Sequence, residues 1–106
     1  MTETLIKQVK RKLDITWEDE GTNARVNEII DSGIPYLLHK LGITDEEFDF
    51  SVAGAENTLF LAYCLYEWNH SLNEFEDNYS KLIADIRTKY EVAQFLKDEE
   101  TNSEQT

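Results

Sequence analysis

The sequence holds a single proline, four glycines and a single cysteine in 106 residues. A β-sandwich or barrel needs more turn-forming residues than this, so the scarcity of proline and glycine argues against an all-β fold. Because Cys64 has no second cysteine to pair with, the fold does not depend on an intrachain disulfide or on an oxidising compartment.

Long hydrophobic runs are also missing. The longest covers residues 59–66, far short of the roughly 20 residues that a membrane-spanning helix needs. Residues 1–12 alternate charged side chains with leucine and isoleucine, and they lack the apolar core of a secretory signal peptide. We therefore expect a protein that is made and kept in a cytoplasm and that has no membrane partner.

Basic residues are few: ten lysines and arginines stand against 22 aspartates and glutamates, which leaves a formal net charge of −12. Such a charge opposes tight binding to nucleic acids and to anionic membranes, and it favours a basic protein partner. It would also suit the wall of a channel through which DNA passes. One basic cluster occurs, and it consists of Lys7, Lys10, Arg11 and Lys12. We interpret this cluster as a solvated helix face, or as a face that meets the acidic surface of the next subunit. We do not interpret it as a nucleic-acid patch.

What the sequence does contain is helical periodicity, over a length that fits one domain. The first predicted helix covers residues 2–13, with one apolar stripe. Thr16 followed by Asp19 resembles a capping box, so a single helical turn is expected there, ended by Gly21.

The second predicted helix begins at residue 22 or 23, because Thr22 or Asn23 can cap it. Pro35 cannot donate a backbone hydrogen bond, so we expect a kink or a break at this position. Gly42 is predicted to stop the helix. Residues 44–47 resemble a further capping box, which is expected to open a short turn that ends near Phe50.

The third predicted helix covers residues 55–69 and is apolar on every side over residues 59–66. Because such a helix must be covered all round, part of its surface is expected to meet another subunit. A fourth helix is predicted to open at a capping box of Ser71 and Glu74 and to form a long antiparallel hairpin with the third. Its apolar stripe has α-helical spacing: Phe75, Tyr79, Leu82, Ile83, Ile86 and Tyr90.

The predicted fold class is therefore all-α, a small helical bundle of about four main helices. The domain covers residues 1–96. Residues 97–106, KDEETNSEQT, are too polar to fold alone, and we expect them to form a flexible, disordered acidic tail.

Candidate catalytic and metal-binding residues have simpler interpretations. His39, His70 and Cys64 are scattered singly, whereas a structural zinc site usually takes four cysteine or histidine ligands at characteristic spacings. Acidic residues favour helix N-termini for electrostatic reasons. This reading accounts for two carboxylate pairs that otherwise resemble the magnesium site of a nucleotide hydrolase: Glu46 with Asp49, and Glu74 with Asp77. We expect no catalytic residue, no metal and no cofactor, and hence no enzyme.

Two sets of residues are candidate contact surfaces. Aromatic side chains often anchor interfaces, and the candidates for contact with a subunit or partner are Trp17, Tyr63, Tyr66 and Trp68. Carboxylates repel DNA, and the candidates for a surface that faces a DNA channel are Asp45, Glu46, Glu47, Glu74 and Asp77.

The order of features along the chain is informative as a whole. An amphipathic N-terminal helix precedes the segment 13–20 (LDITWEDE) and a helix that carries Arg25; the hydrophobic segment 63–69 (YCLYEWN) follows, and then a Phe-x-x-Asn-Tyr step at residues 75–79. This order resembles the head–tail connector family, the head-completion or adaptor proteins, of siphovirus-type bacteriophages. The resemblance covers residues 3–93 and rests on the combination, since no single motif is specific.

The resemblance implies a structural virion protein with a helical-bundle fold. Such subunits bind below the portal protein after DNA packaging and form a ring, commonly dodecameric, that continues the DNA channel and offers a platform to a stopper or tail-completion protein. It also implies assembly in the cytoplasm of a bacterial host, a final place at the head–tail interface of the virion, and a subunit that can remain monomeric until it meets the portal. The alternatives are a small acidic regulatory adaptor that binds a basic protein, and a magnesium-dependent hydrolase.

Overall fold

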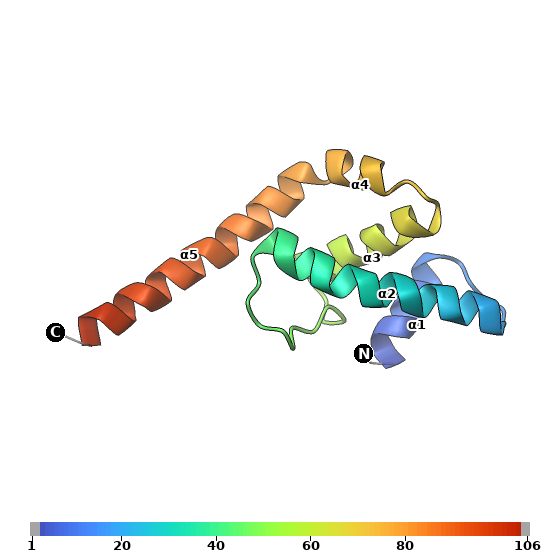
Figure 1. Ribbon diagram of the computed structural model, residues 1–106, viewed down its shortest axis with the longest axis horizontal. Helices are drawn as coiled ribbons and strands as arrows, with labels where there is room; N and C mark the ends of the chain where they lie inside the picture. Colours follow the sequence, from blue (N-terminus) through green and yellow to red (C-terminus); the bar gives the residue numbers. More distant parts are fainter. Residues whose placement is uncertain (1–2, 105–106) are drawn as a thin grey trace.

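The computed structural model describes residues 3–104, with side chains for residues 3–99, and its ribbon consists of helices joined by turns and loops (Figure 1). This confirms the all-helical fold class, and the described residues contain no strand. Five helices take the place of the four main ones predicted. They are α1 (Glu3–Lys12), α2 (Glu20–Leu41), α3 (Ala55–Trp68), α4 (Leu72–Asn78) and α5 (Ser80–Glu104).

The helices form a compact body from which one helix projects. α2 packs against α3, and α1 packs against both of them (Figure 1). α5 contacts α2, α3 and α4. Every residue from 91 to 99 is exposed, so these contacts are made by the N-terminal half of α5. The C-terminal half of α5 leaves the body and gives the molecule its longest dimension, 59 Å.

α3 lies at the centre of the hydrophobic core. The sequence predicts that part of this all-apolar helix meets another subunit, but α1, α2, α4 and α5 all contact it. Leu59, Phe60 and Cys64 are completely buried, whereas Leu61 and Leu65 are half-buried. The chain itself therefore covers most of α3. The folded loop 42–54 adds surface that the four-helix expectation lacked, and its Phe50 stacks on Phe60 of α3.

The start of α2 differs from the sequence prediction. Asp19 is the N-cap, and its carboxylate accepts a hydrogen bond of 2.9 Å from the backbone N–H of Thr22. Asp19 therefore caps α2 instead of closing a capping box with Thr16, and no helical turn forms between these residues. Gly21, predicted to end such a turn, lies in the first turn of α2.

The middle and end of α2 test two further predictions. Pro35 lies inside a helix that is continuous from Glu20 to Leu41, so the predicted break does not occur. Its side chain is exposed, and a single missing N–H leaves only one carbonyl of the helix without its usual donor. The stop at Gly42 is confirmed: this residue has a φ of 69°, and its N–H bonds back to the carbonyl of His39.

The loop 42–54 contains the predicted short turn at residues 46–47, where the backbone N–H of Phe48 donates to the Asp45 carbonyl at 3.2 Å. No helix follows this turn within the loop. Asp45 accepts a hydrogen bond from the backbone of Glu47 and so forms a local turn in place of a helix cap. The Asn57 side chain donates to the Phe50 carbonyl at 2.7 Å, and Phe50 is buried under the loop. The loop is thus anchored by the buried ring of Phe50 and by two amide contacts, since Gln8 also donates to the Ser51 carbonyl at 2.9 Å.

The predicted fourth helix is divided in two. Tyr79 ends α4 with a φ of −112°, and its ring stacks on Phe75 at a centroid distance of 5.2 Å. Ser71 is the N-cap of α4, but its hydroxyl donates to the Asn69 carbonyl and makes no cap hydrogen bond, so the capping box with Glu74 is wrong. The break redirects the chain and sets the course of α5 away from the body (Figure 1).

The apolar stripe predicted from the sequence is buried only where α5 lies against the body. Ile86 is 4% exposed and belongs to the core, and Tyr90 packs partly against it. The helix includes residues 97–104, which fall in the segment predicted to be a tail, and residues 105 and 106 lie outside the described residues. The expected mobility of residues 97–106 in solution stays a prediction.

Candidate functional site

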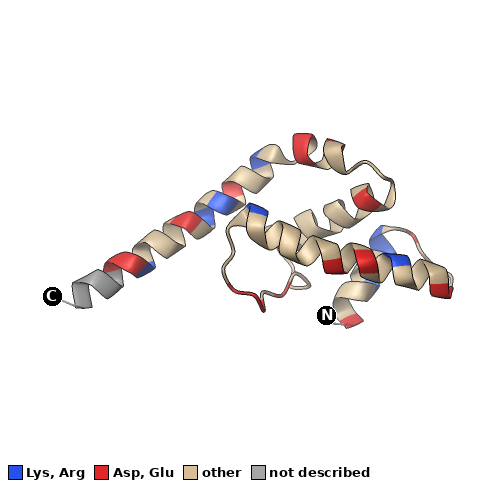
Figure 2. Ribbon diagram, viewed as in Figure 1, with Lys and Arg blue, Asp and Glu red and all other residues tan. Residues whose placement is uncertain are grey.

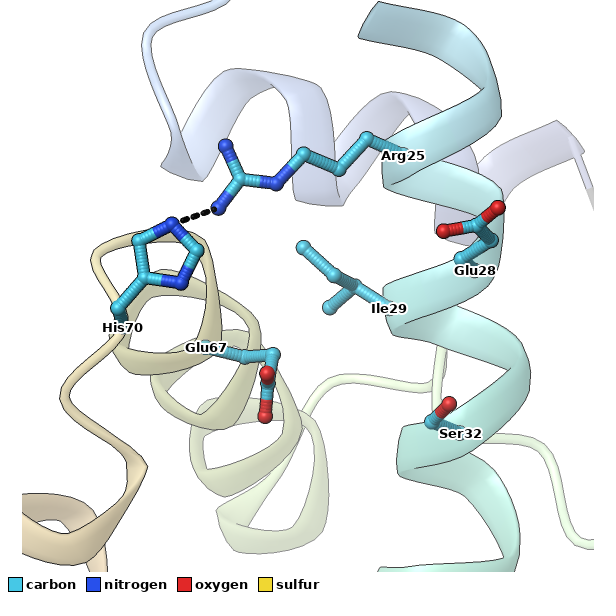
Figure 3. A pocket seen from close by; sticks show the side chains of 6 residues that line it. All are labelled: Arg25, Glu28, Ile29, Ser32, Glu67 and His70. Carbon is cyan, nitrogen blue, oxygen red and sulfur yellow. Dashed lines mark hydrogen bonds between the residues drawn. The ribbon is translucent and has the colours of Figure 1, made fainter.

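A hollow of about 250 Å³ lies between α2 and the C-terminal end of α3 (Figure 3). Arg25 reaches into it from α2, donates a hydrogen bond to the Trp68 carbonyl, and lies 3.2 Å from the Nε2 atom of His70. The guanidinium carbon of Arg25 also lies 4.3 Å from the centre of the Trp68 ring, which is a cation–π contact. The residues that line the hollow are Arg25, Glu28, Ile29, Ser32, Glu67 and His70.

The arrangement in this hollow favours a structural role. His70 has a φ of 58°, in the left-handed region that residues other than glycine seldom adopt. Arg25 ties this strained turn to α2. In Figure 3 the hydroxyl of Ser32 and the carboxylate of Glu67 lie apart from the bonded pair, so the hollow does not align a nucleophile with a base. We interpret it as a clamp that joins the end of α3 to α2.

The four aromatic interface candidates fall into different environments. Trp17 is 50% exposed, and its indole N–H donates to the Thr22 hydroxyl at 3.2 Å. Trp68 is half-buried beneath Arg25, and Tyr66 is half-buried against Phe75 and Tyr79. Tyr63 is only 2% exposed, so it lies inside the core and is not accessible to a partner. The structure therefore does not bring the four into one patch.

The acidic candidates form two separate clusters. Asp45, Glu46 and Glu47 are exposed on the loop 42–54, and Glu74 and Asp77 are exposed on α4. α4 and this loop lie at opposite edges of the molecule (Figure 2). The two i,i+3 carboxylate pairs therefore do not face each other, which contradicts the geometry that a magnesium site shared between them would need.

An exposed apolar face on α5 was not among the sequence-based candidates. Val92 is 51% exposed, Phe95 60% and Leu96 56%, in the half of the helix that leaves the body. Spacings of three and four residues place these side chains on one side of the helix. The sequence indicates this apolar face, since the apolar spacing continues past Tyr90. The sequence does not indicate that the hydrophobic core ends near Tyr90.

The basic cluster predicted from the sequence lies on α1. Lys7, Arg11 and Lys12 are exposed, while Lys10 pairs with Glu18 at 3.7 Å. Beside Arg11 and Lys12, a hollow of about 370 Å³ opens between α1 and α3, with Leu61 in its lining. This is a second surface where charge and apolar area lie together.

Two polar clusters connect helices elsewhere on the surface. Tyr36 donates a hydrogen bond to Glu76, which also pairs with Lys40 at 3.5 Å, and these contacts tie α2 to α4. Partial burial, and then the bond to Glu76, raise the pKa of Tyr36 above its ordinary value. The pKa of Glu76 is lowered, first by the hydrogen bond from Tyr36 and then by the charge of Lys40.

The second cluster joins the start of α3 to α5. Glu56 accepts a hydrogen bond from Lys89 and lies 3.4 Å from the hydroxyl of Tyr90. Burial acts to raise the pKa of Glu56, but the hydrogen bond and the charge of Lys89 outweigh it, so the pKa is lowered overall. The same pairing raises the pKa of Lys89.

The soft metal-ligand side chains lie apart. His39 is exposed near the end of α2, His70 is held by Arg25, and Cys64 is buried in the core. Burial, and then the negative charge of Glu67, raise the pKa of Cys64 to about 12, so the group is a neutral thiol. Within the described part of the chain, no group of three or more histidine, cysteine, aspartate or glutamate side chains is arranged to hold a metal ion.

None of the helices in residues 3–104 combines the length and the apolar character needed to cross a membrane. A comparison with protein-family models found no match, and neither did comparisons with curated proteins and with solved structures.

Proposed function

We propose that this chain is a structural subunit of the head–tail connector of a siphovirus-type phage, with an assembly role in place of a catalytic one. In this role the subunit binds below the portal after DNA packaging, forms a ring that continues the DNA channel, and receives a stopper or tail-completion protein. It assembles in the bacterial cytoplasm and ends at the head–tail interface of the virion.

One observation supports this proposal above the others. The C-terminal half of α5 projects from the body and carries exposed Val92, Phe95 and Leu96 on one face. A subunit that works alone gains nothing from such a face, whereas burial of these side chains against a partner gives a favourable hydrophobic contribution. The resemblance over residues 3–93 suggests which assembly supplies the partner.

The charge distribution adds to the proposal. With a net charge of −12, the subunit does not attract the DNA that a channel must release. The two exposed acidic clusters lie at opposite edges, so a single channel-lining surface does not include both of them (Figure 2). We propose that one cluster faces the channel and that the other faces outward or towards a partner.

Electron microscopy of the purified chain, alone and mixed with the portal protein of the same genome, tests the function. We expect a ring of density below the portal, even if the isolated chain is monomeric. The double variant Phe95→Ser/Leu96→Ser should weaken ring formation, and Val52→Ser, which changes an exposed apolar residue on the loop 42–54, is the control. Subunits that stay monomeric at high concentration and with the portal present would refute the connector function.

The acidic regulatory adaptor is the second candidate, favoured by the exposed carboxylates on both edges. It predicts a soluble complex of fixed small stoichiometry with a basic protein, and no ring. Sedimentation of the chain with the portal separates the two functions, because the connector gives a large, closed assembly.

A further inference from the structure

We propose that the projecting half of α5 docks in the hollow between α1 and α3 of a second copy of this chain. The proposal rests on the function given above for the ring that the contact builds. It goes beyond that function by naming both surfaces of the subunit contact.

The donor surface is the distal face of α5. Phe95 and Leu96 are more than half exposed, and Val92 lies one turn before Leu96 on the same side. Asp98 and Glu99 are exposed one turn beyond Phe95, so the apolar face ends in two carboxylates. This surface is an amphipathic helix with an acidic tip.

The acceptor surface is the hollow of about 370 Å³ lined by Gln8, Arg11, Lys12, Asn57 and Leu61. Leu61 offers apolar area and is only half-buried within its own chain. The two amides are engaged internally, since Asn57 donates to the Gln8 side chain at 2.9 Å. Arg11 and Lys12 are exposed at the rim, and among the described residues no hydrogen bond or ion pair occupies their side chains.

The two surfaces are complementary in charge. Residues 3–12 carry four basic residues and one acidic residue, whereas residues 91–100 carry four acidic residues and one lysine. Two copies with a net charge of −12 repel each other in most orientations. Because α1 holds four of the ten basic residues of the chain, it is the surface that an acidic helix of another copy approaches at the least cost.

The tip of α5 is far from the hollow of its own chain. Among the described residues α1 and α5 make no contact, and the C-terminal end of α5 lies at the opposite end of the molecule from α1 (Figure 1). The occupant must therefore be another copy. Since donor and acceptor are different surfaces, each subunit keeps one of each available, and the contact propagates until it closes into a ring or extends as a filament.

A reciprocal charge swap tests the contact in the full chain. Sedimentation at high protein concentration and low salt should show that Arg11→Glu/Lys12→Glu and Asp98→Lys/Glu99→Lys each weaken self-association roughly tenfold, and that an equimolar mixture of the two variants associates again. Lys81→Glu, which changes an exposed lysine at the proximal end of α5, is the control and should not alter association. Circular dichroism confirms that each variant is folded, and Arg11→Gln/Lys12→Gln replaces the first variant if its α1 unfolds.

Cysteine cross-linking tests whether α5 of one copy lies in the hollow of another. Leu61→Cys and Phe95→Cys are combined in one chain and treated with a short bismaleimide, while the buried native Cys64 stays unreacted. We expect a ladder of dimers, trimers and larger species, whereas a mixture of the two single variants stops at dimers. Phe95→Cys combined with Ser32→Cys, an exposed position on α2 that does not line the hollow between α1 and α3, should give no ladder.

These experiments distinguish a failure of the proposed contact between α5 and the hollow from a failure of the proposed connector function. Portal-dependent rings that form equally well with Arg11→Glu/Lys12→Glu, together with no ladder, would overturn the contact and leave the connector function standing. A ladder and a restored association without any portal-dependent ring would support the contact and refute the connector function. Failure of the mixture to restore association would exclude pairing between these charges.

Discussion

The α-carbon of Gly33 faces the ring of Tyr63 so closely that a methyl group on it would lie 2.6 Å from Cε1 and 2.9 Å from Cδ1. The same methyl group would lie 3.3 Å from Cε2 of Phe60. α2 and α3 therefore approach each other at a point where no side chain fits between them. This close approach makes Gly33 a packing residue in the middle of a helix.

Gly33→Ala should destabilise the protein although alanine is the better helix former. Overpacking costs about 1–3 kcal/mol and the propensity gain is about 1 kcal/mol, so we expect a net loss of up to about 2 kcal/mol. The Tyr63 ring is buried and cannot retreat, which favours the upper part of this range. Urea denaturation measures the free energy of unfolding. Ser32→Ala, at the neighbouring exposed position, should change it little, and an equal effect of both substitutions would contradict the argument.

Ile86→Ala should show where α5 enters the core. Ile86 is buried, so its truncation should cost about 2–5 kcal/mol. Val92→Ala, six residues further along the helix and half-exposed, should cost less than about 0.5 kcal/mol. Thermal and chemical unfolding of both variants check the difference; a free-energy change near zero for Ile86→Ala would place this residue outside the core.

Arg25→Met should loosen the junction between α2 and the end of α3. The substitution removes the hydrogen bond to the Trp68 carbonyl and the cation–π contact, with an expected cost of about 1–2 kcal/mol. Arg25→Lys should recover only part of this loss, because an ammonium does not form the planar stacked contact. Hydrogen exchange at residues 69–71 gives the local readout, and unchanged protection in Arg25→Met would exclude the clamp.

Acid should weaken the link between α3 and α5. The folded-state pKa of Glu56 lies below its ordinary value of 4.5, so its contribution is fully present above that value and is lost as the pH falls through the lowered folded-state pKa. We expect Glu56→Gln to cost about 0.5–1 kcal/mol at neutral pH and to differ little from the wild type at pH values below the folded pKa. Glu91→Gln, which alters the exposed pair with Arg87, should show a smaller difference at neutral pH. A constant gap between Glu56→Gln and the wild type across this range would contradict the assignment.

Charge reversal should reveal which acidic cluster faces DNA. The unmodified chain should not bind duplex DNA measurably near physiological salt, where weak non-specific binders reach roughly 10⁻⁴ to 10⁻⁶ M. Asp45, Glu46 and Glu47 changed to Lys form one variant, and Glu74 with Asp77 changed to Lys form the other. In portal-bound rings, only the variant whose cluster lines the channel should retain DNA in a salt-sensitive way. Tight duplex binding by the unmodified chain would argue for a DNA-handling role of the basic α1.

The sequence predicts this fold well where the signal is local. The helical stripe of α1, the continuous apolar run of α3 and the stop at Gly42 follow from the residue types within a short segment and from the backbone freedom of glycine. The capping boxes at Thr16 and Ser71 fail because each rests on a two-residue match. Asp19 instead caps α2 through a local bond to Thr22, whereas the stacking of Tyr79 on Phe75, which divides the predicted fourth helix, depends on how the chain packs. The candidate interface residues are limited in the same way, because a local pattern does not give burial. Tyr63 and Trp17 are both aromatic in the sequence, and only packing shows that Tyr63 is buried and Trp17 is exposed.

The sequence by itself determined the helical character of the chain, its acidic charge and the concentration of basic residues at residues 7–12. Only the tertiary structure decided that most of α3 is covered by its own chain, that the acidic clusters lie on opposite edges, and that Phe95 and Leu96 remain exposed. The physical reason is the separation along the chain of the residues that decide each property. Periodicity and charge are properties of neighbouring residues, whereas burial depends on which helix faces meet, and the break at Tyr79 directs α5 out of the body before its apolar stripe ends.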